Sequence, residues 1–313
     1  MRLQGQEMDL SVIIVSYNTR ELLRGCLDSV FADVDPGLEY EVIVVDNASA
    51  DGSVEMICDS FPQVRLLANS QNRGFAASNN QAIEQSSGQY VILLNPDTLV
   101  RKGALESLMA LLEERRDAGV VGPKLLFPNG SFQHSAFTFP TLAMIFLDFF
   151  PLHHRLLDSR INGRYPRGLY ERAEPFLIDH PLGAALMVRR PVIDEVGLLD
   201  EGFFMYCEEI DWCMRIKEAG WRILCDPRAE IAHHVGQSTR QFRDDMYVEL
   251  HRSRYRLYQK HYGPGFRRAA RWLVALGVWS QGLRARWAAM RGHLDRRDLE
   301  MRMRAYREVR SLS

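Results

Sequence analysis

Residues 10–18 read LSVIIVSYN, and residues 41–53 read EVIVVDNASADGS. Each stretch opens with a short apolar run rich in β-branched residues, as buried strands do, and closes on polar side chains. Two more such runs follow at Val64–Leu67 and Tyr90–Leu94, and the segments between the runs carry apolar residues three and four positions apart. Continuously apolar strands that alternate with helices are typical of a mainly parallel sheet covered on both faces. The sequence therefore predicts an α/β fold, in which ligands bind beyond the carboxyl ends of the strands.

The alternation is interrupted in the middle of the chain. Residues 127–180 are rich in Pro, Phe, His and Arg and show no sustained period, which predicts an irregular insertion. The other expected elements are a helix at Gly103–Arg116, a short strand at Val120–Val121, a strand at Gly183–Val188, a helix at Glu208–Ala219, and strands near Trp221–Cys225 and Glu230–His233. After the turn signal Gly263-Pro264-Gly265, the rest predicts Arg-rich helix.

The composition is that of a globular chain, because 46% of the 313 residues are hydrophobic and 25% are charged. The longest nearly uninterrupted apolar run, Ala269–Trp279, has 11 residues, fewer than the roughly 20 that a transmembrane helix needs, so we expect no such helix. The N-terminal MRLQGQEMDL lacks the apolar region of a signal peptide. The five cysteines form no C-x-x-C pair. We therefore expect a reduced, cytoplasmic chain.

Two nucleotide-binding motifs are absent from the sequence. There is no G-x-x-x-x-G-K-[ST] loop, and no G-x-G-x-x-G follows the first strand, which ends in Ser16-Tyr17-Asn18. These absences argue against a P-loop NTPase and against a standard dinucleotide-dependent oxidoreductase.

Polar residues stand where the second predicted strand ends. Ser49 and Asp51 are good helix N-cap types, and helix capping accounts for one of them without requiring Asp46. A carboxylate at this edge can accept the N3–H of a uracil or thymine ring, which a cytosine does not offer. The next loop, which contains Gly74 and precedes Asn79, has two interpretations. In the first, Gly74 serves only as a turn and Asn79 only as a buried hydrogen-bond partner. In the second, Arg73 and the N-terminus of the helix face a phosphate-bearing ligand.

The fourth predicted strand ends in Asn95-Pro96-Asp97. This tripeptide is a common turn, but here it ends a buried strand at the same sheet edge as Asp46. Asp97 can supply a carboxylate oxygen to a hard cation. Downstream, His233 and His234 end a strand, and one of the two could complete the metal shell with Asp97.

An acidic cluster follows at Glu208, Glu209 and Asp211, flanked by Phe, Tyr, Trp and Cys residues. Asp211 and Arg215 are four residues apart, so one reading is a surface helix with a single ion pair. The other reading is functional, because carboxylates held against an apolar wall have raised pKa values and suit a general base.

Taken in order from about residue 10 to 240, these stretches resemble the family 2 glycosyltransferases, which are inverting enzymes of the GT-A fold. The resemblance is greatest to bacterial rhamnosyltransferases and related enzymes of cell-surface polysaccharide synthesis. The matching stretches are SVIIVSYN, VIVVDNASADGS, NRGFAASNN, VILLNPDT and FFMYCEEIDWCMRIKEAGWRILCDPRAEIAHHVGQS.

The resemblance implies a set of site residues. The nucleotide-sugar donor would be bound by Ser16, Tyr17, Asn18, Asp46, Asn47, Arg73, Gly74, Asn79, Asn95 and Asp97. Asp97 would bind Mg²⁺ or Mn²⁺ at the family's Asp-x-Asp motif, with His233 as a further ligand and His234 as the spare. Glu209 would be the catalytic base, with Asp211 and Glu208 as competitors for that role.

Two residues depart from the family pattern. Asn95 replaces an acidic residue, which removes one negative charge and bears on strict metal dependence. Glu209 replaces Asp, so its carboxylate stands one methylene further from the backbone.

The resemblance further implies an inverting hexosyltransferase that moves a sugar, expected to be rhamnose from dTDP-rhamnose, to a lipid-linked or polysaccharide acceptor. A UDP-linked hexose, galactofuranose or N-acetylhexosamine is the alternative donor. The rival functions are nucleotidyl transfer and a non-catalytic sugar-nucleotide-binding protein. We expect a GT-A domain at residues 1–250, with a nucleotide-sugar half up to about residue 125 and an acceptor half at 126–250, and a helical tail at 251–313.

The tail carries a strong charge asymmetry. Residues 252–313 hold 16 basic and 4 acidic residues, a net charge of +12, whereas the 23 basic and 36 acidic residues elsewhere give −13. An apolar stripe recurs at three- and four-residue steps through Trp272, Leu276, Trp279, Leu283, Trp287, Met290 and Leu294. This pattern predicts a helix that docks on the rest of the chain or on a second copy, or that lies on an anionic membrane surface, and it does not indicate nucleic-acid binding.

Overall fold

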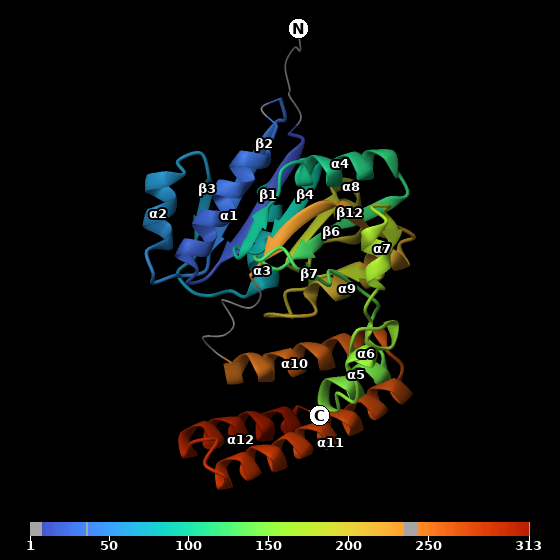
Figure 1. The fold of residues 1–313 in the computed structure, drawn as a ribbon. Helices are drawn as coiled ribbons and strands as arrows, with labels where there is room; N and C mark the ends of the chain where they lie inside the picture. The colour runs from blue at the N-terminus through green and yellow to red at the C-terminus, as the bar shows by residue number, and fades with distance from the viewer. Residues whose placement is uncertain (1–7, 36, 235–242, 313) are drawn as a thin grey trace. The chain divides into compact units, whose positions relative to one another are not determined.

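The computed structural model describes residues 8–35, 37–234 and 243–312. The chain forms two compact units (Figure 1). Unit 1 comprises Met1–Phe137, Tyr165–Phe204 and Glu208–Ser238, and unit 2 comprises Thr138–Arg164, Met205–Cys207 and Thr239–Ser313. The domain boundary expected at residue 250 stays a prediction; residues 138–164 of the predicted acceptor half lie in the same compact unit as the tail.

Unit 1 is built on one mixed sheet with the strand order β3-β2-β1-β4-β11-β6-β12-β5. The strands are β1 (Leu10–Ser16), β2 (Tyr40–Asp46), β3 (Arg65–Ala68), β4 (Tyr90–Leu94), β5 (Thr98–Val100), β6 (Ala118–Leu126), β11 (Ala185–Arg189) and β12 (Arg222–His233). The first four strands are parallel, as predicted, whereas β11 is antiparallel to β4 and β6. The short strands are β7 (Phe132–Gln133), β8 (Ala136–Phe137), β9 (Phe176–Leu177) and β10 (His180–Pro181).

Helices cover both faces of this sheet (Figure 1). They are α1 (Arg20–Asp33), α2 (Ser53–Ser60), α3 (Phe75–Ile83), α4 (Ala104–Glu114), α7 (Arg167–Glu171), α8 (Arg190–Val196) and α9 (Glu208–Glu218). Buried side chains of α1, α2 and α4 share one hydrophobic cluster with alternate residues of the central strands. The helix α3 contacts β1 and β2 and contributes no residue to that cluster, which places it on the other face.

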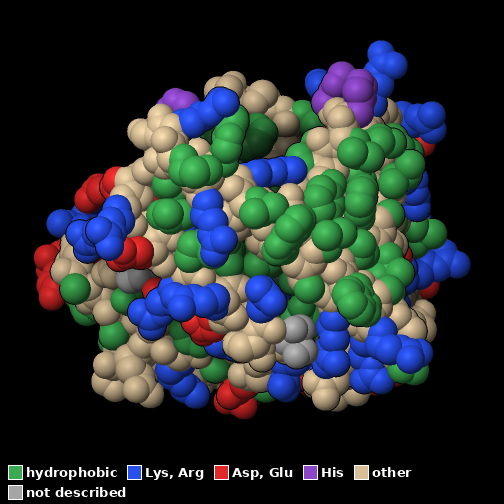
Figure 2. Space-filling model, turned by 90° about the horizontal axis from the view of Figure 1, so that it is seen from below, with side chains coloured by type: hydrophobic (Ala, Val, Ile, Leu, Met, Phe, Trp, Pro, Cys, Tyr) green, Lys and Arg blue, Asp and Glu red, His purple; other side chains and the backbone are tan. Residues whose placement is uncertain are grey.

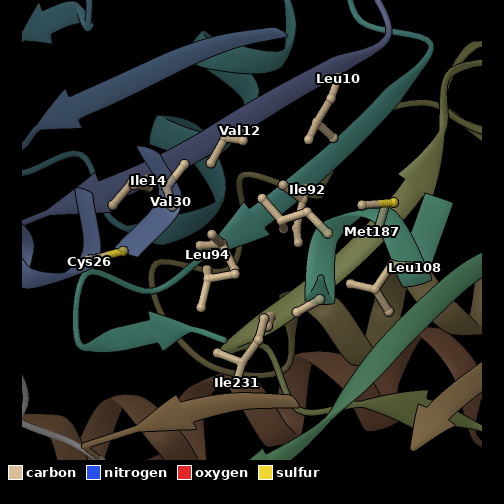
Figure 3. Close-up of a cluster of buried hydrophobic side chains, with 14 of the residues drawn as sticks. Leu10, Val12, Ile14, Cys26, Val30, Ile92, Leu94, Leu108, Met187 and Ile231 are labelled. Atoms are coloured by element: carbon tan, nitrogen blue, oxygen red, sulfur yellow. The ribbon is translucent and has the colours of Figure 1, made fainter. Parts of the chain in front are cut away.

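The hydrophobic cluster holds the central strands in place (Figure 3). Leu10, Val12 and Ile14 of β1 are fully buried, and their spacing of two residues directs them to one face of the sheet. Each such side chain contributes about 1.5–3 kcal/mol by leaving water. The register pairs Ser16 with Asp46, so the carboxyl ends of β1 and β2 lie at one edge.

Two strands are longer than the sequence predicted. The strand β6 runs over nine residues alongside β12, and it includes Gly122, where a Cβ atom would come within 2.4 Å of Pro181. The strand β12 is continuous over 12 residues rather than two strands, with a register shift against β6 between Asp226 and Glu230. Pro227 lies in this shift, where its missing N–H interrupts the ladder.

Unit 2 is helical. Its elements are α5 (Leu142–Phe149), α6 (His154–Leu157), the 3₁₀ turn η1 (Arg160–Asn162), α10 (Arg243–His261), α11 (Pro264–Met290) and α12 (Arg296–Ser311). At Gly277 of α11 a Cβ atom would lie 2.1 Å from the ring of Phe149, so the glycine lets α5 and α11 approach closely. Asp148 also forms an ion pair with Arg254 of α10 at 2.8 Å. The middle part of the aperiodic insertion, residues 138–164, is therefore packed with the tail.

The helix α11 buries small residues and exposes large ones. Its buried residues are Ala270, Val274, Gly277, Val278, Gly282 and Ala285. The predicted apolar stripe lies on another face of α11 as far as Met290, where Trp272 and Met290 are each 78% exposed and Trp279 is 57% exposed, whereas Leu294, its predicted end, follows the helix. Figure 2 shows hydrophobic side chains bordered by Lys and Arg side chains. In the part of the chain that the structure describes, no helix is both long and apolar enough to cross a membrane.

Candidate active site

The loops that follow β1 and β2 are tied together by hydrogen bonds at the carboxyl edge of the sheet. Asn18, which has a positive φ of 51°, donates its N–H to Ser49 Oγ at 2.9 Å and accepts the N–H of Ala50 at 2.8 Å. Ser16 accepts the N–H of Asn47 at 2.9 Å. The predicted residues Ser16, Asn18 and Asn47 are thus brought together, and Tyr17 lies between two of them in the sequence.

Asp46 is 1% exposed and has one carboxylate oxygen in use. Its Oδ1 accepts the N–H of Ser49 at 2.8 Å. Its Oδ2 is buried and has no hydrogen-bond partner among the described residues. Because an unpaired buried carboxylate oxygen costs free energy, this atom is suited to accept a hydrogen bond from a ligand.

Asn47 links the same edge to the start of α3. Its Oδ1 accepts hydrogen bonds from Ser78 Oγ at 2.8 Å and from Asn69 Nδ2 at 3.1 Å, and its Nδ2 donates to the Gly74 carbonyl at 3.3 Å. Gly74 has a φ of 83°, and a Cβ atom there would come within 2.4 Å of the Phe204 carbonyl oxygen. Only glycine fits this turn. Together with the hydrogen bond from Asn47, the turn sets the position of Arg73, the residue before Gly74.

The other two predicted residues of this region differ in environment. Asn79 is buried and donates to the Phe75 carbonyl within its own helix at 2.8 Å, which matches the structural reading of this residue. Arg73 is exposed and donates to Gln81 Oε1 at 3.3 Å. An exposed guanidinium at the start of α3 can meet an anion.

The turn after β4 places Asp97 next to the end of β12. Asn95 donates its N–H to the Ala184 carbonyl at 2.9 Å, and its own carbonyl accepts the N–H of Thr98 at 3.2 Å. The side chains of Asp97 and His233 are 5% and 6% exposed, and their Oδ1 and Nε2 atoms are 3.4 Å apart. His234 meets Asp97 through its backbone N–H instead, at 2.9 Å from the Asp97 carbonyl. Of the two predicted histidines, His233 therefore directs its ring to Asp97.

Gln133 contacts the ring nitrogen of His233 that faces away from Asp97. Its Nε2 lies 3.2 Å from His233 Nδ1, and its Oε1 is buried without a partner among the described residues. Rotating the amide by half a turn exchanges the two atoms, so that Oε1 accepts a hydrogen bond from Nδ1–H. The lone pair of His233 Nε2 then faces Asp97, and the separation of 3.4 Å is longer than an ordinary hydrogen bond. In this arrangement the Nε2 lone pair of His233 and the carboxylate of Asp97 can both ligate a divalent cation.

The acidic cluster at the start of α9 contains carboxylates in different surroundings. Asp211 is fully buried, and its Oδ2 forms an ion pair with Arg215 Nε at 3.0 Å. Arg215 also donates to the carbonyls of Val196 and Leu198 at 3.0 and 2.7 Å. The i,i+4 ion pair that the sequence offered for this helix is present, and it ties α9 to the end of α8.

Glu209 is buried but has no ion pair among the described residues. It is 9% exposed, its Oε2 has no hydrogen-bond partner within the described ranges, and burial raises its pKa above the ordinary value of 4.5. The backbone N–H of Gly183 opposes part of this rise in pKa, and a Cβ atom at Gly183 would lie 3.3 Å from the carboxyl carbon. Glu208, its neighbour, is 4% exposed. A raised pKa and an available oxygen suit Glu209 to accept a proton.

The backbone before α9 is strained. Tyr206 and Cys207 have φ angles of 71° and 67°, in the left-handed region that residues with a side chain rarely adopt. Such strain is typical of functional sites, where the surrounding structure holds it.

Three residues that support the site were not predicted. Gln133 lies in the aperiodic insertion, Gly183 lies on the loop before β11, and Asn80 binds the 199–201 segment through the Leu199 carbonyl at 2.9 Å and Glu201 Oε1 at 3.1 Å. Asn80 follows the predicted Asn79 directly, and this Asn-Asn pair is the sequence feature that could have pointed to Asn80.

Residues 11–197 match a known protein family, described as glycosyl transferase family 2. The chain belongs to this family. The family 2 chain is 29% identical over 286 residues to an N-acetylglucosaminyl-diphospho-decaprenol L-rhamnosyltransferase of Mycobacterium tuberculosis, which covers 85% of this chain and 89% of the relative. It is 25% identical over 241 residues to the rhamnosyltransferase WbbL of Escherichia coli, with 74% and 85% covered.

Solved structures show the same fold. The mannosyltransferase PcManGT from Pyrobaculum calidifontis, in complex with GDP-Man and Mn²⁺, matches with a TM-score of 0.57 and 17% identity over 97% of this chain and 83% of that one. The predicted family and the predicted GT-A type of fold with a helical C-terminal region are confirmed.

Proposed function

We propose that this glycosyltransferase is an inverting, metal-dependent hexosyltransferase that moves rhamnose from dTDP-rhamnose to a lipid-linked or polysaccharide acceptor. The names of two relatives support the sugar and the lipid-linked acceptor, since both are rhamnosyltransferases and one acts on a diphospho-decaprenol. The observation that carries the reaction type is Glu209, a buried carboxylate with an unpartnered oxygen and a raised pKa.

The residues divide the reaction between them. Glu209 takes the proton of the acceptor hydroxyl as the acceptor oxygen attacks the anomeric carbon, and the bond from that carbon to the donor phosphate breaks on the opposite side. One new glycosidic bond replaces one phosphate ester bond, and the nucleoside diphosphate leaves with the electron pair. A single base is sufficient, so inversion follows without a covalent enzyme intermediate.

The donor is held by the loops at the sheet edge. Asp46 Oδ2 accepts the N3–H of the pyrimidine, and Arg73 faces the diphosphate at the start of α3. Asp97 and His233, with Gln133 behind the imidazole, are the residues that would hold Mg²⁺ or Mn²⁺. When bound, the cation offsets negative charge on the departing diphosphate.

A UDP-linked hexose, galactofuranose or N-acetylhexosamine is the alternative donor, because the Asp46 carboxylate accepts the N3–H of uracil and thymine alike. A donor panel separates the two readings. We expect dTDP-rhamnose, in the presence of Mn²⁺, to give the largest thermal stabilisation and the fastest hydrolysis. A clear preference for a UDP-sugar would replace rhamnose as donor, and the absence of any response to the panel would contradict the proposed reaction. Inversion is checked by NMR of the anomeric proton of the product.

The exposed stripe on α11 supports a further part of the proposal, which is that the chain works at the cytoplasmic face of an anionic membrane. Tryptophans favour the headgroup boundary, and arginines favour anionic lipid. Arg268, Arg271 and Arg284 stand among the apolar residues of the stripe along α11. A membrane surface accounts for both the exposed apolar area and the surrounding positive charge, whereas a homodimer through the same helix accounts for the apolar area alone.

A further inference from the structure

A concave pocket in unit 2 is lined by arginine side chains from two helices. It has a volume of about 540 Å³ and lies between the C-terminal part of α10 and the first turns of α11. Its arginines are Arg252, Arg256, Arg267, Arg268 and Arg271. No acidic residue stands among its described lining residues. We call this site the arginine pocket.

Three of these guanidiniums have no acidic partner among the described residues. Arg252 is paired with Glu249 of α10 and with Glu308 of α12. Arg267, Arg268 and Arg271 form no ion pair within the ranges that the structure describes. Like charges that converge on one pocket repel one another, so the folded chain gains free energy when an anion enters.

The shape and chemistry of the pocket favour a phosphate group with several free oxygens. Guanidinium groups bind phosphate through two parallel hydrogen bonds, and the three free oxygens of a terminal phosphate can meet more guanidiniums at once than the two oxygens of a carboxylate or a single chloride ion. Tyr255 also lines the pocket, and burial raises its pKa to about 12, so the phenol keeps the proton that it can donate. The volume lies in the range of small-molecule sites, and a concave pocket does not fit the extended backbone of a nucleic acid.

The position of the pocket indicates where such a phosphate comes from. Arg268 and Trp272 are four residues apart on α11, so they are neighbours on one helix face. Trp272, which is 78% exposed, begins the apolar stripe. A ligand with an anionic head and an apolar tail can therefore place its head among the arginines and its tail on the adjacent apolar stripe.

We propose that the arginine pocket is a binding site for the terminal phosphate or diphosphate headgroup of a membrane lipid. The proposal rests on the proposed membrane association, and it adds recognition of one kind of headgroup to general attraction by charge. A terminal phosphate offers oxygens to several guanidiniums at once, whereas a phosphodiester headgroup offers fewer.

The test uses the full chain and two kinds of vesicle with equal surface charge, one containing phosphatidic acid and the other phosphatidylglycerol in neutral phosphatidylcholine. We expect the chain to bind the phosphatidic acid vesicles about tenfold more tightly, the size of effect expected for added bidentate hydrogen bonds. The pocket variant Arg268→Gln/Arg271→Gln should lose this preference. The control variant Arg284→Gln/Arg297→Gln removes the same charge outside the pocket and should weaken binding to both vesicles while keeping the preference.

Each result decides the proposal. Equal binding to both vesicles by the unaltered chain, or a preference retained by the pocket variant, overturns it. No binding to either vesicle overturns the membrane association on which it rests. Inorganic diphosphate is a separate probe: if it raises the Tm of the unaltered chain but not of the pocket variant, and the vesicles show no preference, the ligand is a free phosphate and the lipid headgroup is excluded. The pocket variant should unfold at no lower temperature than the unaltered chain at low salt, because it has lost two mutually repelling charges.

Discussion

His233 Nε2 lies 3.4 Å from Asp97 Oδ1, which joins the last strand of the sheet to the turn after β4. If this pair holds the cation, Asp97→Ala should weaken binding of the intact donor far more than binding of the bare nucleoside, because the role of Asp97 acts through the diphosphate. Gln133→Ala should raise the Mn²⁺ concentration needed for activity by roughly 10- to 100-fold, since Gln133 orients the imidazole. Isothermal titration with donor and nucleoside measures the first effect.

Chelation provides the matching experiment on the unaltered chain. EDTA should reproduce the effect of Asp97→Ala, and added Mn²⁺ should reverse it in the unaltered chain only. Full activity in EDTA without any added divalent ion would show that Asn95, which stands where the family has an acidic residue, marks a metal-independent site.

Glu209→Gln preserves the size of the side chain and removes its ability to accept a proton. We expect transfer to fall by roughly 10²–10⁴ while donor binding survives. Asp211→Asn should act on folding instead, because it breaks the buried pair with Arg215, at a cost of about 3 kcal/mol in the free energy of unfolding. Single-turnover kinetics and thermal unfolding separate the two effects. Near-normal turnover in Glu209→Gln together with a folded but inactive Asp211→Asn would reverse the assignment.

The raised pKa of Glu209 gives two pH effects of known sign. Activity needs the ionised carboxylate, so the acidic limb of the kcat/KM profile should lie above the ordinary value of 4.5. The free energy of unfolding falls as the pH rises, because the folded state binds the Glu209 proton more tightly than the unfolded state does. The stabilisation from this proton is complete below the pKa of Glu209 in the unfolded chain, and it is lost as the pH rises through the pKa in the folded chain. Glu209→Gln should therefore have a higher Tm than the unaltered chain at pH 7–8, and a similar Tm below about pH 4.5. A Tm difference that is the same at both pH values would contradict this.

Gly183 keeps the Glu209 carboxylate in place. A Cβ atom there would stand 3.3 Å from the carboxyl carbon, so Gly183→Ala should displace the base and lower kcat by up to roughly 10², with little effect on KM for the donor. Gly168→Ala is the control, because a Cβ atom at Gly168 in α7 meets nothing within 4 Å. If both variants have the kcat of the unaltered chain, the contact with Gly183 does not position the base.

The sequence predicted the parts of the site that carry local signals. Asp46 and Asp97 each follow a run of buried apolar residues, so their place at the sheet edge could be inferred from the runs alone. The pairing of Asp211 with Arg215 follows from their spacing on a helix. In each case the information lies within a few consecutive residues.

Other features depend on segments that meet only in the folded chain. Gln133 reaches His233 from an insertion without any period, and Gly183 meets Glu209 from the loop before β11. The packing of Phe149 on Gly277, which joins part of the insertion to the tail, has no signal in either segment. The positions of Gln133 and Gly183 in the site, and the division of the insertion between the two units, therefore depend on packing between segments that are distant in the sequence.

The last prediction concerns the exposed stripe of α11. Removing the tail is a poor test, because α11 packs against α5 through Gly277 and Phe149, so truncation would expose that contact. Trp272→Ser/Trp279→Ser changes two side chains that are 78% and 57% exposed, at little cost to folding.

We expect the unaltered chain to cosediment with anionic vesicles at low salt, less so at high salt, and only weakly with neutral vesicles, since each arginine near the surface adds about 1 kcal/mol that salt screens. The tryptophan variant should lose most of this binding and keep donor hydrolysis. The control Leu152→Ser/Leu177→Ser removes two apolar side chains that are 67% and 54% exposed elsewhere, and it should bind as the unaltered chain does. If the unaltered chain ignores vesicles and sediments as a dimer that the tryptophan variant cannot form, the stripe joins two copies and the membrane reading is wrong.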